Sequence, residues 1–208
     1  MASGGTLRRI AILSWIVAGV AVVGVASWLA LAPRPAPGRF AFPAVPSSRV
    51  VEAPDGHAYQ YIAAPNLSWD KARAAAERHS WQGHKGYLAT IDSAAEFQFV
   101  LQNVFPDDTD VTYLGGRQTA PGAWRWVTGP DAKAEDGKGT LFWRGYEGGE
   151  KIGFADWMFS AFQHGGKWDV DRVCCVTLFS YRKRQFSTSL GNGDAVEGVA
   201  GYLVEYGE

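Results

Sequence analysis

Two adjacent cysteines, Cys174 and Cys175, are the only thiols of the 208-residue chain and its first candidates for chemistry. Consecutive residues of a strand point to opposite faces, so such a pair is a poor candidate for an unstrained disulfide. A tetrahedral metal site needs four ligands, and no nearby His or further Cys joins this pair. We therefore expect neither a disulfide framework nor a cysteine metal site.

Oxygen ligands for a divalent cation occur in two short patterns. Asn192 and Asp194 flank a glycine in LGNGD, and Asp169 alternates with Asp171 in KWDVDRV. Calcium takes about 6–8 oxygen ligands, several of them carboxylates. A Gly-rich turn explains the first pair more simply, and one face of a strand explains the second. Asn192 and Asp194 are thus weak metal candidates, and we expect no cofactor.

The sequence contains none of the common catalytic motifs that we considered. The sequence has no G-x-S-x-G elbow, no H-E-x-x-H, no Walker A loop and no dinucleotide fingerprint. Its four histidines lie on or beside predicted loops and helix ends, where a solvated imidazole is the default. The formal net charge of −1 does not provide the strongly basic face that a nucleic-acid partner requires. We expect a protein that is not an enzyme and does not bind nucleic acid.

An aromatic segment, FADWMFSAFQH at residues 154–164, is unusually apolar for a predicted loop. Phe154 and Trp157 are expected to pack in the core, whereas Met158, Phe159 and Phe162 are harder to place there. Exposed aromatic and Met residues gathered on a loop are typical of protein contact surfaces. We predict that all five residues take part in binding a partner: Phe154, Trp157, Met158, Phe159 and Phe162.

Two helices are predicted before the aromatic segment in the chain. Ser68 is a good N-cap for WDKARAAAERH, residues 69–79, which carries apolar residues at helical spacing. A second helix begins at Ser93, where SAAE forms a capping box with Glu96. Its predicted apolar face consists of Phe97, Val100, Leu101 and Val104.

Short strands make up the rest of the expected fold. One strand is predicted around residues 59–62, and GYLATI, residues 86–91, is another short apolar segment. Beyond residue 110 the strands alternate with Gly-rich turns. They are VTYLGGRQ, AWRWVTG, TLFWRG, RVCCVTLFSY, RQFSTSL and GYLVEY. The pattern predicts an α+β domain with short antiparallel strands and a long loop, rather than a parallel α/β fold.

The order of these segments resembles the C-type lectin-like domain in its bacterial form. Trp69 and Ala72 match the W-x-x-A pattern of that family's first helix, and GYLATI matches its GGHLATI phrase. Residues 113–116 stand where the family has WIGL, and GAWRWVTG followed by LFWRG is typical of bacterial members. The resemblance covers about residues 56–206 and implies a lectin-like fold.

The resemblance fails at the family's calcium and sugar site. That site uses a Glu-Pro-Asn or Gln-Pro-Asp tripeptide and a later Trp-Asn-Asp. No proline occurs from Asp131 to Glu208, and LGNGD stands near the expected place of the second element. Calcium is therefore not expected. The aromatic segment occupies the long-loop region, which implies that a hydrophobic partner surface has replaced the sugar chemistry.

The first 49 residues predict a membrane attachment. Residues 10–32 carry no charge and, at about 1.5 Å per residue, span a bilayer core as a helix. The two arginines before them predict a cytoplasmic tail at residues 1–9. Residues 33–49 are a Pro-rich spacer, and residues 50–208 form the globular domain. A cleavable signal peptide ending at residue 32 is the alternative, against which the length of the apolar run and Pro33 argue.

These observations predict a non-catalytic, membrane-anchored interaction module of the bacterial inner membrane, with its head in the periplasm. We expect it to be an accessory or structural subunit that docks on other membrane proteins. The alternative is a calcium-independent or residual carbohydrate-binding protein of the cell envelope. In that case Trp143, Trp157 or Trp168 would stack on a sugar ring.

Overall fold

The computed structural model describes residues 47–105, 111–164, 167–168, 173–179, 185–190 and 198–207. The predicted membrane span, tail and nearly all of the spacer lie outside these residues. Within the described part of the chain, no helix is both long enough and apolar enough to cross a membrane.

The two predicted helices form where their caps place them. Helix α2, Trp69–Ala76, begins after Ser68, whose hydroxyl accepts a hydrogen bond from the Lys71 N–H. Helix α3, Ala94–Asn103, begins after Ser93, whose hydroxyl accepts from the Glu96 N–H at 3.2 Å. A 3-10 helix η1, Gly129–Lys133, and the one-turn α4, Ala134–Gly137, were not predicted because they carry no apolar period.

Thirteen described strands complete the α+β architecture, and every predicted strand is among them. The additional strands have two residues each, too short to show an alternating pattern. In chain order the thirteen strands are β1 (Val51–Glu52), β2 (Ala58–Ala63), β3 (Ser80–Trp81), β4 (His84–Leu88), β5 (Val111–Ala120), β6 (Ala123–Trp126), β7 (Thr140–Arg144), β8 (Glu150–Lys151), β9 (Gln163–His164), β10 (Lys167–Trp168), β11 (Val173–Phe179), β12 (Gln185–Leu190) and β13 (Val199–Tyr206).

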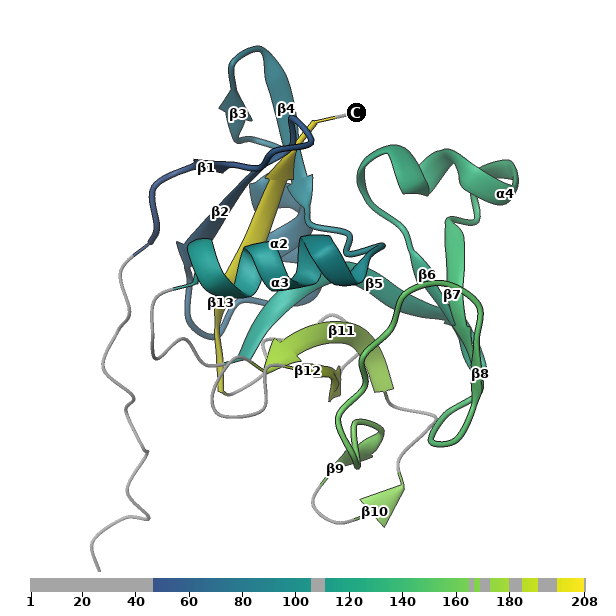
Figure 1. The fold of residues 1–208 in the computed structure, drawn as a ribbon. Coiled ribbons are helices and arrows are strands. Elements are labelled where there is room, and N and C mark those ends of the chain that lie inside the picture. The colour runs from purple at the N-terminus through teal and green to yellow at the C-terminus, as the bar shows by residue number, and fades with distance from the viewer. Residues whose placement is uncertain are drawn as a thin grey trace, which may run out of the picture. The chain divides into compact units, whose positions relative to one another are not determined.

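Strand β13 lies at the centre of the main sheet (Figure 1). It pairs antiparallel with β2 and β4 but parallel with β5, where Gly201 lies opposite Thr112. The expectation of antiparallel strands is therefore wrong at this pair. Strand direction follows from how distant segments come together, which the residues of either strand do not encode. From β5 the sheet continues through β6 and β7 to β8 on one path and through β11 to β12 on another.

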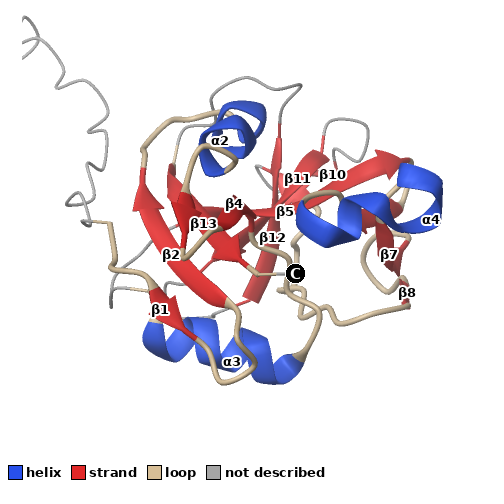
Figure 2. Ribbon diagram, turned by 90° about the horizontal axis from the view of Figure 1, so that it is seen from above, coloured by secondary structure: helices blue, strands red, loops and turns tan. Residues whose placement is uncertain are grey.

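The helices cover opposite faces of β13, α2 on one side and α3 on the other (Figure 2). Because side chains alternate along a strand, Leu203 packs with the α3 residues while Tyr202 and Val204 pack with the α2 residues. The next residue on the α3 side is Glu205, a carboxylate in a strand that is otherwise almost wholly apolar.

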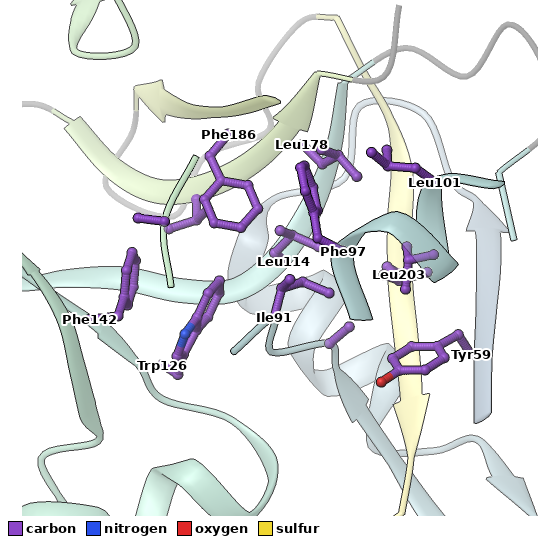
Figure 3. Close-up of a cluster of buried hydrophobic side chains, with 14 of the residues drawn as sticks. Tyr59, Ile91, Phe97, Leu101, Leu114, Trp126, Phe142, Leu178, Phe186 and Leu203 are labelled. Carbon is purple, nitrogen blue, oxygen red and sulfur yellow. The ribbon is translucent and has the colours of Figure 1, made fainter. Parts of the chain in front are cut away.

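Aromatic rings fill the core on the α3 side (Figure 3). Trp126 stacks on Phe142 with ring centroids 4.4 Å apart. Phe186 meets Phe97 edge-on at 5.2 Å and Trp126 at 6.0 Å. These contacts join α3, β6, β7 and β12 into one apolar cluster, which fixes the frame that carries the aromatic segment.

The adjacent cysteines depart from expectation, because Cys174 and Cys175 form a disulfide with each other. The pairing register of β11 shifts against β12 between Val173 and Cys175. The argument from opposite faces holds only for a regular strand, and at this irregularity it does not apply.

Candidate functional site

A cavity of about 450 Å³ opens beside the start of α3. Its walls come from the turn before β2, from the segment between β4 and α3, and from η1 and the start of β7. We call it the acidic cavity, because its ionisable lining groups are Asp55, His57, Asp92, Glu96 and Asp131, together with the phenols of Tyr59 and Tyr87.

Glu205 lies behind this lining and is only 2% exposed. Its carboxylate accepts hydrogen bonds from the Thr90 N–H at 2.9 Å and from His57 Nδ1–H at 2.6 Å. The hydrogen bond and the negative charge of Glu205 raise the pKa of His57 to about 9, against an opposing effect of partial burial. His57 is therefore an imidazolium at neutral pH, and the buried carboxylate has the paired charge that burial requires.

Glu96 joins the same network from the first turn of α3. Its carboxyl accepts hydrogen bonds from the Tyr59 hydroxyl at 2.8 Å and from the Asp92 N–H at 2.9 Å. Burial, followed by the charge of Glu205, raises the pKa of Glu96 to about 8. A second buried negative charge is thus avoided at neutral pH, because Glu96 holds a proton there.

Tyr87 lies against the same buried carboxylate, Glu205. Its side chain is 7% exposed, and its hydroxyl is buried beside that carboxylate. Burial and the charge of Glu205 raise the pKa of the Tyr87 phenol above its usual range, so the group stays neutral.

The acidic cavity was not predicted from the sequence, although one of its members was. Glu96 was predicted to form a capping box with Ser93: the Ser93 hydroxyl does accept from the Glu96 N–H, but the Glu96 carboxyl accepts from the N–H of Asp92, one residue before the cap. The signal that sequence reasoning missed is the carboxylate in GYLVEY, two positions after Leu203 and on the same face of the strand. A charge at a core position of a strand indicates a buried polar network.

The aromatic segment divides into packed and exposed residues. Phe162 is 1% exposed and packs against Trp157 at 4.8 Å and Trp124 at 5.4 Å, so it lies in the core instead of on the surface. Phe154, Trp157 and Met158 are half-buried against the same core. Phe159 alone in the segment is a large hydrophobic residue with high exposure, 77%.

Backbone contacts hold this segment in place. The Met158 N–H donates to the Phe186 carbonyl at 2.9 Å, and the Phe186 N–H donates to the Asp156 carbonyl at 2.8 Å. The Thr188 hydroxyl donates to the Ala161 carbonyl at 2.6 Å. The exposed ring of Phe159 is therefore carried by a segment anchored on β12 from both sides.

The remaining predicted site residues are placed only in part. Trp143 is half-buried, and its indole N–H donates to the Tyr146 carbonyl at 3.2 Å. Trp168 belongs to β10 by its backbone, which pairs with β9. Asn192 and Asp194 lie outside the described residues. Among the residues that are described, no group of three or more His, Cys, Asp or Glu side chains could hold a metal ion.

Comparison with known proteins gives one relative in sequence. No family model matches the chain. Halomucin from Haloquadratum walsbyi (strain DSM 16790 / HBSQ001) is 34% identical over 176 residues, which cover 84% of this chain. The chain spans only 2% of halomucin, so nearly all of that protein lies outside the match.

The solved structures that resemble the chain include C-type lectin domains. The C-type lectin CEL-I from Cucumaria echinata is 15% identical, and the match covers 73% of this chain and 90% of CEL-I with a TM-score of 0.46. The carbohydrate-recognition domain of the mouse scavenger receptor C-type lectin is 15% identical, with coverage of 75% and 93% and a TM-score of 0.47. Scores below 0.5 do not by themselves establish a shared fold. The likeness to a C-type lectin-like domain therefore rests on the order of motifs in the sequence.

Proposed function

We propose that the chain is a non-catalytic binding module with a C-type lectin-like head, which docks on the extracytoplasmic surface of another membrane protein. The observation that carries the proposal is Phe159, a ring with 77% exposure on a segment whose neighbouring aromatic residues are packed. Aromatic side chains such as Phe are enriched at the centres of protein–protein interfaces. Ile152, at 46% exposure, is the other large hydrophobic residue exposed in the described part of the chain.

The anchoring of the aromatic segment supports a docking role. Binding is weakened by the entropy lost when a flexible loop becomes ordered, and a segment held on β12 has already lost that freedom. The partner we propose is a membrane protein because residues 10–32 are predicted to hold the chain in the inner membrane, with the head in the periplasm. An anchored head meets partners in the same membrane at a high effective concentration.

The proposal is non-catalytic because the one histidine of the acidic cavity is already committed. In the described structure the imidazole of His57 donates from Nδ1 to Glu205, and the hydrogen bond to Asp55 comes from the His57 backbone N–H, so the ring has no hydrogen bond to a nucleophile there. A general base needs hydrogen-bond contact with the group from which it takes a proton.

The test is affinity purification of the tagged full-length chain from its native membrane in mild detergent, followed by mass spectrometry. We expect a membrane protein at fixed stoichiometry with the wild type. Phe159→Ala should lose about 2 kcal/mol of binding, or roughly 30-fold in affinity, because it removes a buried aromatic contact. Gln82→Ala, which changes an exposed residue of the β3–β4 turn, is the matched control. Unchanged recovery with Phe159→Ala would refute docking through this surface.

A calcium-independent sugar site is the second candidate, and Trp143 is the residue that favours it. Its ring is half-buried, and its indole N–H is held by the Tyr146 carbonyl, so its orientation is fixed before any ligand arrives. An amphipathic ring held in this way suits contact with the apolar face of a sugar. Glycan-array binding in the presence of a calcium chelator, lost on Trp143→Ala without loss of fold, would support this function.

A further inference from the structure

The disulfide between Cys174 and Cys175 joins two neighbouring residues of β11, and the chain contains no other cysteine. In a regular strand, neighbouring side chains point to opposite faces, whereas the two Cβ atoms of a disulfide lie only about 3.5–4.5 Å apart. A regular strand and a disulfide between adjacent residues are therefore alternatives. The disulfide holds β11 out of a regular strand at this point, and its reduction removes that constraint.

The pairing of β11 is irregular on both sides at the disulfide. Against β12, Val173 and Cys175 lie opposite successive residues, so Cys174 is an extra residue of β11. Against β5, the register shifts between Cys175 and Thr177. An extra residue of this kind is a β-bulge, which bends a strand and interrupts its ladder of hydrogen bonds. The disulfide thus coincides with the place where β11 departs from regular pairing with both of its neighbours.

The two cysteines differ in their access to solvent. Cys174 is half-buried, whereas Cys175 is 1% exposed. Thiol–disulfide exchange begins when an external thiolate attacks one sulfur of a disulfide, and its rate depends on access to that sulfur. The more exposed residue, Cys174, is therefore the point of attack.

Reduction by a dithiol balances in two steps. One thiolate of the dithiol attacks Cys174 Sγ, the S–S bond breaks, and Cys175 leaves as a thiolate that takes up a proton. The second thiolate of the dithiol then displaces Cys174 from the mixed disulfide, and Cys174 takes up a proton in its turn. The cysteine pair gains two electrons and two protons, and the dithiol becomes a disulfide.

A short path joins the disulfide to the segment that carries Phe159. On β12, Thr188 lies opposite the residue that follows Cys175. The Thr188 hydroxyl donates a hydrogen bond to the Ala161 carbonyl at 2.6 Å, and Ala161 comes two residues after Phe159. The backbone hydrogen bonds that anchor the segment also go to β12. Among the described strands, β12 is paired with β11 alone, so its position depends on β11.

We propose that the Cys174–Cys175 disulfide is a reversible redox switch for the surface around Phe159. In the oxidised form, the disulfide holds the bulge of β11, and β12 keeps the aromatic segment ordered. After reduction by a dithiol, β11 changes its local pairing, and the contacts from β12 to the aromatic segment weaken. Docking then becomes weaker, because a partner must order the segment again. The effect on docking rests on the proposed function, whereas the loosening of the segment does not.

Hydrogen exchange of the two redox forms tests the switch without a partner. The full-length chain in a non-ionic detergent is equilibrated with oxidised or reduced dithiothreitol, and alkylation followed by mass spectrometry counts its free thiols. In the reduced form we expect the amides of β12 and of residues 154–164 to exchange about tenfold faster. Strand β2, which is not paired with β11, is the internal control and should not change. Re-oxidation should restore slow exchange.

Cysteine variants separate the disulfide from other effects of the reductant. Cys174→Ala/Cys175→Ala should exchange like the reduced wild type in both solutions, because it cannot form the bond. Cys174→Ala alone keeps the buried Cys175 side chain and should behave in the same way, which excludes an effect of lost packing at Cys175. The wild type remains a test if neither variant folds, since its two forms share one sequence.

Affinity purification of both redox forms tests the effect on docking. We expect the reduced form to bind its membrane-protein partner about tenfold more weakly than the oxidised form. Phe159→Ala should bind weakly in either form. If Phe159→Ala binds as well as the wild type, the proposed docking function fails, and hydrogen exchange still decides whether the disulfide controls the segment.

Three results would overturn the switch. The first is that the chain keeps two free thiols after equilibration with oxidised dithiothreitol, or that its disulfide opens only in denaturant. The second is that both redox forms exchange equally in residues 154–164, or that β2 loses protection together with them, which would mean unfolding of the whole domain. The third is that both forms bind the partner equally although Phe159→Ala weakens binding.

Discussion

The acidic cavity and the aromatic segment each place a side chain against the usual preference, one inward and one outward. Glu205 is a carboxylate with 2% exposure, and Phe159 is an aromatic ring with 77% exposure. The buried carboxylate has its partners within the same chain, His57 and Thr90, because burial of a charge without them costs several kcal/mol. The exposed ring of Phe159 is uncharged and needs no hydrogen-bond partner within the chain. The buried carboxylate therefore bears on the stability of the fold, and the exposed ring is the basis of the docking proposal.

The largest expected effect separates two aromatic residues of one segment. Phe162→Ala should lower the free energy of unfolding by about 3–5 kcal/mol, because a buried ring among Trp124 and Trp157 leaves a cavity. Phe159→Ala should change it by less than about 0.5 kcal/mol, since its ring is in water. Urea unfolding monitored by circular dichroism measures both. Equal losses would mean that Phe159 is also part of the core.

A second expected effect tests the inward-facing carboxylate. Glu205→Ala should cost about 2–3 kcal/mol, because it leaves the Thr90 N–H without its acceptor and the His57 imidazolium without its counter-ion. Glu150→Ala, which breaks an ion pair exposed on both sides, should stay within about 0.5 kcal/mol. If the two variants unfold at the same urea concentration, the buried network adds nothing to stability.

The same network predicts how stability depends on pH. The pKa of His57 rises from 6.5 to about 9 and that of Glu96 from 4.5 to about 8, so the folded chain holds both protons more tightly than the unfolded chain. The stabilisation is complete below the unfolded pKa values and is lost as the pH rises through the folded ones. The free energy of unfolding should therefore fall from about pH 4.5, where Glu96 begins to contribute, to about pH 9, and most steeply between 6.5 and about 8, where both groups contribute. A double variant, His57→Gln/Glu96→Gln, should show a flatter profile over this interval, and a profile as steep as that of the wild type would contradict the assignment.

The smallest expected effect concerns the helix that carries Glu96 to the cavity. Ser93→Ala should cost about 1 kcal/mol, because the Glu96 N–H loses the capping hydroxyl that accepts it at 3.2 Å. Ser80→Ala, at an exposed position of β3, should be close to neutral in the same thermal or urea unfolding experiment. A shift in the pH profile of Ser93→Ala would further link the cap to the position of Glu96.

Local signals in the sequence predicted the elements of the fold well. Ser68 and Ser93 cap their helices as expected, and Phe97, Val100, Leu101 and Val104 are buried. The longer strands were also predicted, because alternation and Gly-rich turns act over a few residues. The parallel pairing of β13 with β5 was not predicted, since it joins segments almost ninety residues apart.

Residue identity by itself determined that this chain builds two capped helices and a series of short strands rich in aromatic side chains. Its motif order also determined the resemblance to a C-type lectin-like domain and the departure from that family's calcium motifs. Only the tertiary structure decided that Phe162 is buried while Phe159 is exposed, and that Glu205 meets His57 and Thr90 beside a cavity. The physical reason is that caps and periodicity depend on neighbours in sequence. Burial and the pairing of charges depend on residues that only folding brings together.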